Sequence, residues 1–210
     1  MSDCSAPLTG FAHGMSGIAA ALLEFYHITQ NEDSLNLALS AMNYENSCFN
    51  TDVNNWPDFR QFDTSRKQKN NCSMAWCHGA PGIGLQRLRA WEITGDEKWL
   101  NDATKAAYST LKSSMEFFQT QRGNFSLNHG IFGNNELLLE YDIKTNSNLF
   151  KQYVYQMAKN AIENIEMKGR TWPCGLHNSD ESTGFMLGIA GVAYHFMRLY
   201  KYDQVENILI

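Results

Sequence analysis

The sequence has no long apolar run, no excess of positive charge and no convincing period-two alternation of apolar and polar residues. No stretch reaches the roughly 20 apolar residues that a membrane-spanning helix needs. Lys and Arg number 17 against 22 Asp and Glu, and the formal net charge is −5. A nucleic-acid surface requires clustered positive charge, so no nucleic-acid partner is expected. The missing alternation argues against half-buried β-strands.

The first ten residues have neither a positively charged segment nor an apolar core, so they do not resemble a signal peptide. The expected location is therefore the cytoplasm. The cysteines number five and have no regular spacing, which favours free thiols or metal ligands over a disulfide framework. A chain of 210 residues is long enough for one sizeable core, and a single domain over residues 1–210 is expected.

A Gly-x-x-Gly element occurs four times, and an apolar stretch follows each copy. The copies begin about 50 to 65 residues apart, roughly the length of two helices and two loops. Self-similarity at such a period indicates a repeat architecture. The four elements are Gly14-Met15-Ser16-Gly17, Gly79-Ala80-Pro81-Gly82, Gly130-Ile131-Phe132-Gly133 and Gly188-Ile189-Ala190-Gly191.

Apolar residues at helical spacing predict an inner helix after each element and an outer helix between successive elements. The outer helices are expected over residues 31–46, from the N-cap Asp96 onward, and over residues 147–168. The predicted fold class is all-α, built from repeated helix pairs. The inner helices are expected to begin at Gly14, Gly82, Gly133 and Gly188.

Polar residues directly ahead of the glycines form a candidate metal site. If the copies are structurally equivalent, these residues lie at the same end of their helices and face one another around a central mouth. Several imidazoles and a thiol at one place are the composition of a zinc site. The residues are His13, Cys77, His78, Asn128 and His129.

Two polar and aromatic stretches, residues 48–69 and 169–183, interrupt the helical pattern on the rim that carries the glycine elements. Long loops in compact domains are often functional. Each stretch is open to two interpretations, an ordinary connection or a substrate-facing rim.

Five motifs follow one another along essentially the whole chain. They are Leu8-Thr9-Gly10-Phe11-Ala12-His13-Gly14; Asn55-Trp56-Pro57-Asp58-Phe59-Arg60; Ala75-Trp76-Cys77-His78-Gly79-Ala80-Pro81-Gly82-Ile83-Gly84-Leu85; Leu127-Asn128-His129-Gly130 running into Gly133-Asn134-Asn135-Glu136-Leu137-Leu138-Leu139-Glu140; and Cys174-Gly175-Leu176 with Gly184-Phe185-Met186-Leu187-Gly188-Ile189-Ala190-Gly191. In this order and spacing they resemble the lanthionine-synthetase cyclase family. The similarity is greatest to the C-terminal part of the cyclase domain of class II (bifunctional) lanthipeptide synthetases.

The resemblance implies a double-layered α/α toroid with one zinc ion at the central mouth. It also implies a precursor peptide as partner, in which a cysteine thiolate adds to dehydroalanine or dehydrobutyrine and forms a thioether ring. A free thiol has a pKa near 8.5, and a coordinating metal removes its proton. The addition produces an enolate, which a nearby imidazole can protonate.

By position in the motifs, Cys77 matches the family's first zinc ligand, His129 matches the last, and His13 matches the proposed acid/base. His78 follows the ligand cysteine, where proton transfer, substrate contact and a purely structural role all remain open. The other cysteines, Cys4, Cys48, Cys72 and Cys174, are interpreted as bystanders.

Two departures from the family pattern lower the expected activity. Asn128 stands where the family has its remaining ligand, a cysteine, and an amide oxygen is a hard, neutral donor that suits zinc poorly. Two secure ligands remain, one short of the usual three protein ligands of a catalytic site. The chain also holds about four glycine-initiated helix pairs against the family's seven. It is therefore expected to be a partial toroid, with a second chain supplying the missing pairs or a dehydratase domain as a candidate partner.

Three hypotheses follow for the function. The first is a zinc-dependent thioether cyclase impaired by Asn128 and by its length. The second is a non-catalytic module that binds a peptide or completes another chain. The third is a degenerate remnant of a lanthipeptide synthetase. Zinc content separates the first hypothesis from the other two, and self-association or a tight partner separates the second from the third.

Overall fold

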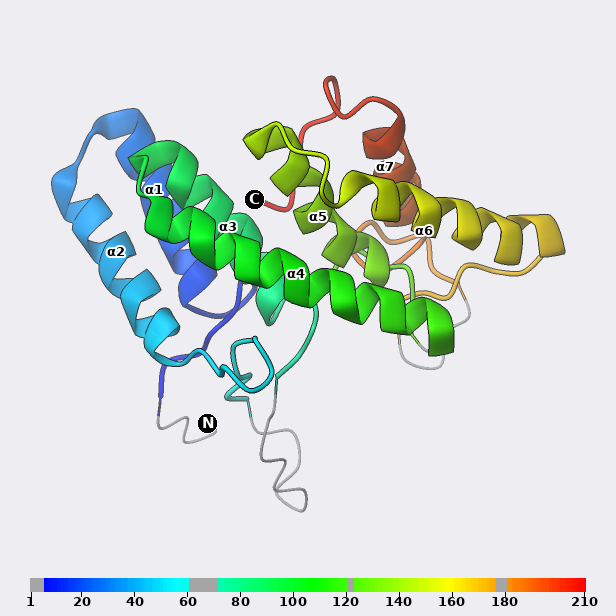
Figure 1. Cartoon of the computed structure of the whole chain (residues 1–210), viewed down its shortest axis with the longest axis horizontal. Helices are drawn as coiled ribbons and strands as arrows, with labels where there is room; N and C mark the ends of the chain where they lie inside the picture. Colours follow the sequence, from blue (N-terminus) through cyan, green and yellow to red (C-terminus); the bar gives the residue numbers. More distant parts are fainter. Residues whose placement is uncertain (1–5, 61–71, 121–122, 177–180) are drawn as a thin grey trace, which may run out of the picture. The chain divides into compact units, whose positions relative to one another are not determined.

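The computed structural model describes residues 6–60, 72–120, 123–176 and 181–210 of the chain. Within these ranges the secondary structure is helical (Figure 1), and the isolated β-bridge between Asn50 and Asn55 is the β-type pairing found there. The all-α prediction is confirmed. The elements are α1 (Met15–Thr29), α2 (Glu32–Ser47), α3 (Ala80–Thr94), α4 (Glu97–Thr120), α5 (Ile131–Thr145), α6 (Lys151–Asn164), the 3-10 helix η1 (Glu166–Lys168) and α7 (Ile189–Tyr200).

The chain forms two compact units, one over residues 1–109 together with residue 210, the other over residues 110–209. The boundary falls inside α4, and each unit is described below by itself. The expected single domain over residues 1–210 stays a prediction. In the part of the chain that the structure covers, no helix is long and apolar enough to cross a membrane.

The four inner helices are α1, α3, α5 and α7, and the first glycine of each Gly-x-x-Gly element is the N-cap in every case. The expected starts at Gly82 and Gly133 were therefore wrong, because α3 begins at Ala80 and α5 at Ile131. The second glycine of each element lies inside the first helical turn rather than ahead of it.

A close backbone approach explains why a glycine stands in that first turn. Each second glycine packs against the carbonyl oxygen of the residue six positions earlier. A Cβ atom there would lie well under 3.0 Å from that oxygen, closer than real Cβ atoms come. The glycine–carbonyl pairs are Gly17 with Phe11, Gly82 with Trp76, Gly133 with Leu127 and Gly191 with Phe185. The same local fold thus recurs four times.

The outer helices α2 and α4 begin where side-chain caps place them. Asn31 Oδ1 accepts from Ser34 N at 2.9 Å, and Asp96 Oδ1 accepts from Lys98 N at 2.9 Å. Capping of this kind satisfies the free N–H groups of a first turn.

The third outer helix begins later than the expected residue 147. The Asp142 carboxylate accepts hydrogen bonds from the backbone N–H groups of Leu149, Phe150 and Lys151, at 3.0, 2.8 and 2.7 Å. These bonds wrap the chain around Asp142 before α6 can start. α6 ends at Asn164, and η1 covers residues 166–168.

In the first unit, α1 and α2 pack against each other as a helical hairpin, with α3 beside α1 (Figure 1). These helices and Trp99 of α4 share an apolar core, which consists of Ala19, Leu23, Ala38, Met42, Ala90 and Trp99. α3 is buried along most of its length, so it is the central element of this unit.

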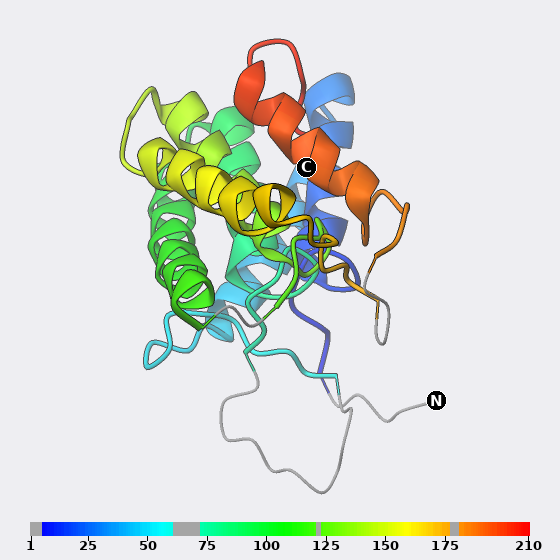
Figure 2. The ribbon, with the colours of Figure 1, turned by 90° about the vertical axis from the view of Figure 1, so that its right-hand side faces the viewer.

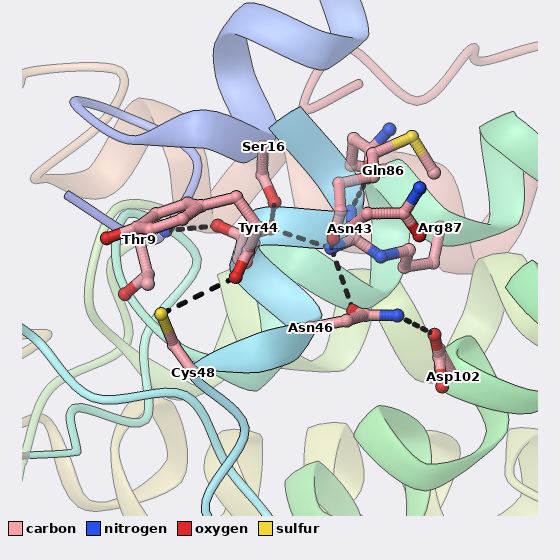
Figure 3. A network of polar contacts seen from close by, with 12 residues as sticks. Thr9, Ser16, Asn43, Tyr44, Asn46, Cys48, Gln86, Arg87 and Asp102 are labelled. Carbon is pink, nitrogen blue, oxygen red and sulfur yellow. Dashed lines mark hydrogen bonds and ion pairs between the residues drawn. The ribbon is translucent and has the colours of Figure 1, made fainter. Parts of the chain in front are cut away.

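A buried polar network joins the three helices and the N-terminal loop of the first unit (Figure 3). The Glu45 carboxylate accepts from Gly10 N at 2.8 Å, Ser16 Oγ at 2.5 Å and Arg87 Nη2 at 2.8 Å. The side chains of Glu45 and Arg87 have no solvent exposure. Burial lowers the pKa of Arg87, and the carboxylate of Glu45 opposes that shift. We call this set the Glu45 network.

In the second unit, α5 contacts both α6 and α7 (Figure 2). Phe132 stacks on His195 with ring centroids 4.3 Å apart. His195 Nδ1 lies 2.6 Å from Glu136 Oε1. The guanidinium of Arg198 donates to Glu136 at 3.1 Å and to Glu140 at 2.5 Å. These paired charges lie in the interior between α5 and α7.

Tyr194 fixes the C-terminal segment to α7 and sets an alkaline limit to stability. Its hydroxyl donates to Glu206 O at 2.7 Å and accepts from Ile208 N at 3.0 Å. Burial raises its pKa to about 12, while the hydrogen bond from Ile208 acts against that rise and Glu136 adds to it. Between pH 10 and 12 the unfolded chain loses this proton first, so the free energy of unfolding falls as pH rises.

We therefore expect Tyr194→Phe to flatten the loss of stability in this alkaline window. A pKa shift of about two units corresponds to a difference of about 2–3 kcal/mol in the free energy of unfolding at the upper end of this pH range. Urea unfolding at several pH values between 9 and 12 measures the effect, with Tyr200→Phe, whose side chain is exposed, as the control. Parallel pH profiles for wild type and Tyr194→Phe would contradict the assignment.

Candidate functional site

The residues ahead of the inner helices are held by one recurring backbone contact. In the first unit, Ala12 N donates to Cys77 O at 3.0 Å. In the second, Asn128 N donates to Met186 O at 2.9 Å. All four residues stand two positions before an N-cap glycine. The same hydrogen bond thus joins equivalent positions of neighbouring copies within each unit.

This register sorts the candidate site residues into two classes. Cys77 and Asn128 occupy the position two residues before the glycine, where the N-terminal copy has Ala12. The three histidines His13, His78 and His129 all occupy the position directly before the glycine.

The Gly10 loop lies directly on the Cys77–His78 backbone in the first unit. Gly10 has φ of +101°, and a Cβ atom there would meet Cys77 O and the Cα of His78 at 3.0 Å. The Glu45 network holds Gly10 N from the other side. Phe11 N also donates to Cys77 O, at 3.1 Å. The network therefore fixes how this loop meets the candidate site.

Asn55 positions the start of α3, a role that the sequence motif did not reveal. Its Oδ1 accepts from Ala80 N at 2.8 Å, and its Nδ2 donates to Ser73 O at 2.9 Å. The N-cap Gly79 has no side chain to offer, so Asn55 supplies the missing acceptor from a distant loop. Cys77 and His78 stand between the two contacts.

A carboxylate and a guanidinium set the electrostatics around Cys77. Arg60 donates to Asp58 from Nε at 2.9 Å and from Nη2 at 2.6 Å. Burial raises the pKa of the Cys77 thiol, Arg60 opposes that rise and Asp58 adds to it. Burial also raises the pKa of Cys72, with a further contribution from Asp58. Without a metal or another activating group, the Cys77 thiol therefore stays protonated at neutral pH.

His78 is buried, and His13 is exposed beside it. Their ring centroids are 5.8 Å apart, and only 1% of the His78 surface is accessible. Among the described residues neither ring nitrogen of His78 makes a hydrogen bond. Burial lowers the pKa of His78, the charge of Arg60 lowers it further, and Asp58 and the backbone of Thr9 act in the opposite direction.

His129 is oriented by the backbone of Gly175. Its Nε2 lies 2.8 Å from Gly175 O. Because a carbonyl oxygen only accepts, Nε2 carries a proton, and this contact selects the tautomer whose lone pair is on Nδ1. A carbonyl in this role is the usual partner of a metal-binding histidine. Gly175 N in turn donates to Leu187 O at 2.7 Å.

Gly175 belongs to the last of the five sequence motifs, and its contact with His129 shows why a glycine stands there. A side chain there would come within 3.0 Å of the His129 ring and of Ser126 Oγ. Gly175 follows Trp172 by three positions, and nothing in that stretch of sequence indicates that it orients a histidine.

The structure groups His13, Cys77 and His78 in the first unit, and Asn128 and His129 in the second. That all five converge on one point stays a prediction. Cys4 and His177, with residues 61–69 and 177–180 of the two expected rim loops, lie outside the described residues.

The donors present do not fit a complete zinc site. Among the residues that the structure covers, no three side chains of His, Cys, Asp or Glu come close enough to hold a metal ion. The candidate set contains one thiol, one imidazole with a prepared lone pair, and the Asn128 amide. A hard, neutral amide is a poor third ligand beside a thiolate.

Comparison with known proteins agrees with the geometry. The lanthionine synthetase C-like protein family matches residues 2–210. The lacticin 481/lactococcin biosynthesis protein LcnDR2 of Lactococcus lactis subsp. lactis is 30% identical over 214 residues, covering 97% of this chain and 22% of that protein. The nisin biosynthesis protein NisC of the same organism is 27% identical over 193 residues, covering 87% of this chain and 42% of NisC.

The fold likeness extends to a solved structure. Nisin cyclase aligns with a TM-score of 0.68 at 22% identity, over 96% of this chain and 48% of that one. The fold class is thus that of an α/α toroid, of which this chain spans about half. It spans less than half of the length of the two curated relatives. The repeated glycine turns, the residues presented ahead of them and the match over residues 2–210 together show that the chain belongs to the lanthionine synthetase C-like protein family.

Proposed function

We propose that this chain is a lanthionine cyclase-type domain that handles a lanthipeptide precursor, and that Asn128 leaves its zinc site one thiolate short. The reaction is the addition of a peptide cysteine thiolate to dehydroalanine or dehydrobutyrine. One observation carries the proposal: both units use the same backbone hydrogen bond to hold the residues ahead of an inner helix, at Cys77 and at Asn128. These are the positions where the family places ligand cysteines.

The addition requires a deprotonated thiol and a proton donor. The peptide sulfur forms a bond to the β-carbon of the dehydro residue, the double-bond electrons move toward the carbonyl, and the resulting enolate takes a proton at the α-carbon. His13 is the candidate proton donor, because its imidazole is exposed and His78 lies against it at 5.8 Å between ring centroids. His78 is buried, so we assign it the positioning of His13.

Zinc would be held by Cys77 and by Nδ1 of His129, and when bound it would supply the acidity that deprotonates a peptide thiol. Asn128 interrupts this set. Apparent zinc affinities of complete protein sites reach about 10–16 kcal/mol and depend on every ligand. The loss of one thiolate should therefore cost several kcal/mol. Weak or partial zinc occupancy, and little cyclase activity of the chain alone, follow from this count.

Restoring the thiolate tests the proposal. We expect Asn128→Cys to raise the bound zinc from well below one equivalent to about one per chain, measured by elemental analysis after matched loading and dialysis against a weak chelator. Asn128→Ser is the matched control, because it changes the size similarly without adding a thiolate. Adding Cys77→Ser to Asn128→Cys should remove the gain.

Full and tight zinc occupancy in the wild type would overturn the incomplete-site proposal. In that case Cys72, His78 or His13 would be the residues to test as the replacement ligand. If Asn128→Ser gains as much bound zinc as Asn128→Cys, the smaller side chain promotes binding by making room or admitting water, and the residue is not itself a ligand.

A non-catalytic role is the second candidate, and the Asn128 amide favours it. A domain that only binds a peptide, or completes a partner chain that carries further helix pairs, needs no metal. It would bind the precursor equally well with and without zinc, and Asn128→Cys would leave binding unchanged. A precursor whose affinity rises when Asn128→Cys is loaded with zinc would count against this candidate.

A further inference from the structure

A cavity of about 580 Å³ lies in the second unit, and its lining residues do not include those of the candidate site. Its walls come from the end of α4, the second half of α6 and the segment that follows η1. A volume of this size is within the roughly 300–1,000 Å³ of small-ligand pockets. Neither the fold nor the proposed cyclase chemistry requires it.

The floor of the cavity is apolar and aromatic. Phe117 lies edge-on to Phe125, with ring centroids 5.5 Å apart, and to Phe118 at 5.3 Å. Ala161 of α6 and Ile165, which directly follows that helix, also line the cavity and are buried. Such a surface favours an aromatic or branched apolar group, since edge-on aromatic contacts add to the burial of area.

Two asparagines of α6, Asn160 and Asn164, line the cavity. Asn160 Oδ1 already accepts from Gln156 Nε2 at 2.9 Å, so its amide has donors to spare. Both polar atoms of the Asn164 amide already make hydrogen bonds. Its Nδ2 donates to Asn160 O at 2.9 Å, and its Oδ1 accepts from Lys168 Nζ at 2.7 Å.

Arg170 supplies the charge of the rim. Its side chain is exposed, and no carboxylate of the described residues lines the cavity or pairs with it. Of the described lining residues, Arg170 is the charged one, so an anionic acceptor on the ligand is complementary to it. A guanidinium binds carboxylates through two parallel hydrogen bonds.

We propose that this cavity binds a short peptide segment in which a carboxylate stands beside an aromatic or branched apolar side chain. Gly169, Arg170 and Thr171 are exposed at its mouth, so a peptide can insert one side chain and keep its backbone outside. The choice of a peptide over a free acid rests on the proposed function. The apolar floor and the cationic rim are observed independently of the proposed function.

Two peptides that differ only in charge test the site. The probes are acetyl-Gly-Phe-Glu-Gly-amide and acetyl-Gly-Phe-Gln-Gly-amide, titrated into the zinc-free, full chain by NMR or calorimetry, with phenylacetate as a third arm. We expect the Glu peptide to bind about three- to fivefold more tightly than the Gln peptide, because an ion pair with an exposed guanidinium contributes up to about 1 kcal/mol. Its affinity should fall as salt is added. Phenylacetate should bind more weakly than the Glu peptide.

Variants locate the binding. Arg170→Gln should abolish the preference for the Glu peptide, and Thr171→Trp, which narrows the mouth, should weaken both peptides. Lys159→Gln removes one positive charge from α6 outside the cavity, where the lysine side chain is 69% exposed, and should change nothing. Thermal unfolding of each variant checks that the fold is intact.

Equal affinity for the two peptides, or an Arg170→Gln variant that keeps the preference, would overturn the proposal. Binding of phenylacetate without binding of the Glu peptide would overturn it in favour of a free aromatic acid. The measurement uses no zinc, so its failure is distinct from a failure of the Asn128→Cys experiment.

Discussion

Replacing Glu45 with alanine will lower the free energy of unfolding by about 3–5 kcal/mol, the usual cost of leaving a buried charge without its partner. The carboxylate is fully buried and binds Arg87 at 2.8 Å, Ser16 Oγ at 2.5 Å and Gly10 N at 2.8 Å. Its loss leaves the buried Arg87 guanidinium without its carboxylate, although hydrogen bonds to Met42 O and Asn46 Oδ1 remain, and it also removes the acceptor of the Gly10 N–H. Urea unfolding measures the change, with midpoint and slope both reported.

The matched control is Glu24→Ala, which breaks the Glu24–Arg89 pair between α1 and α3. That pair is also close, at 2.5 Å, but the Glu24 side chain is 44% exposed and that of Arg89 25%. An exposed pair contributes about 0–1 kcal/mol. Similar losses in the two variants would contradict the importance assigned to burial.

A local readout separates the Glu45 network from general stability. Because Gly10 lies against Cys77 O and His78, Glu45→Gln should disturb the amide signals of Cys77 and His78 even where the fold persists. Unchanged signals for these residues would show that the network stabilises the helices without positioning the candidate site.

Replacing Gly133 with alanine is the second large effect, and we expect a loss of at least about 3 kcal/mol. In a helix interior alanine is ordinarily better than glycine by about 1 kcal/mol. Here the added Cβ would meet the carbonyl oxygen, the carbonyl carbon and the Cα of Leu127, all under 3.0 Å. These are backbone atoms and cannot move aside without displacing Asn128 and His129.

Gly95→Ala is the control for this prediction. Gly95 is the C-cap of α3 with φ of +69°, and no atom lies within 4 Å of a Cβ placed there. The cost should be only the strain of a left-handed residue, about 1–2 kcal/mol. If the free energy of unfolding of Gly133→Ala is within about 1 kcal/mol of the wild-type value, the close approach of Leu127 O is not the reason for a glycine at this position.

The elements of the fold could be predicted because they depend on local patterns. Apolar residues at helical spacing and the four repeated glycine pairs sufficed for the inner helices, and the cap expected at Asp96 marked the start of α4. The starts expected at Gly82 and Gly133 were wrong because the first glycine of each element, rather than the second, is the N-cap. The second glycine is required by a carbonyl that returns to it from the preceding loop, and a glycine in sequence does not show which atom approaches it.

The start of α6 failed for a similar reason. Ser147 is a good cap by composition, but the Asp142 carboxylate takes the backbone N–H groups of residues 149–151 instead. A side chain from the end of one helix thus decides where the next one begins. No periodicity in residues 147–168 contains this information.

The sequence by itself determined which residues stand ahead of the inner helices, and hence that a thiol, an amide and three imidazoles occupy equivalent places in the repeat. Residue type and spacing are local properties, and they also carried the family resemblance. Only the tertiary structure decided what holds these residues: Asn55 at the start of α3, the Glu45 network beneath Gly10, and Gly175 O against His129. Each of these contacts joins segments at least 25 positions apart, where the chain's path rather than its local pattern brings donor and acceptor together.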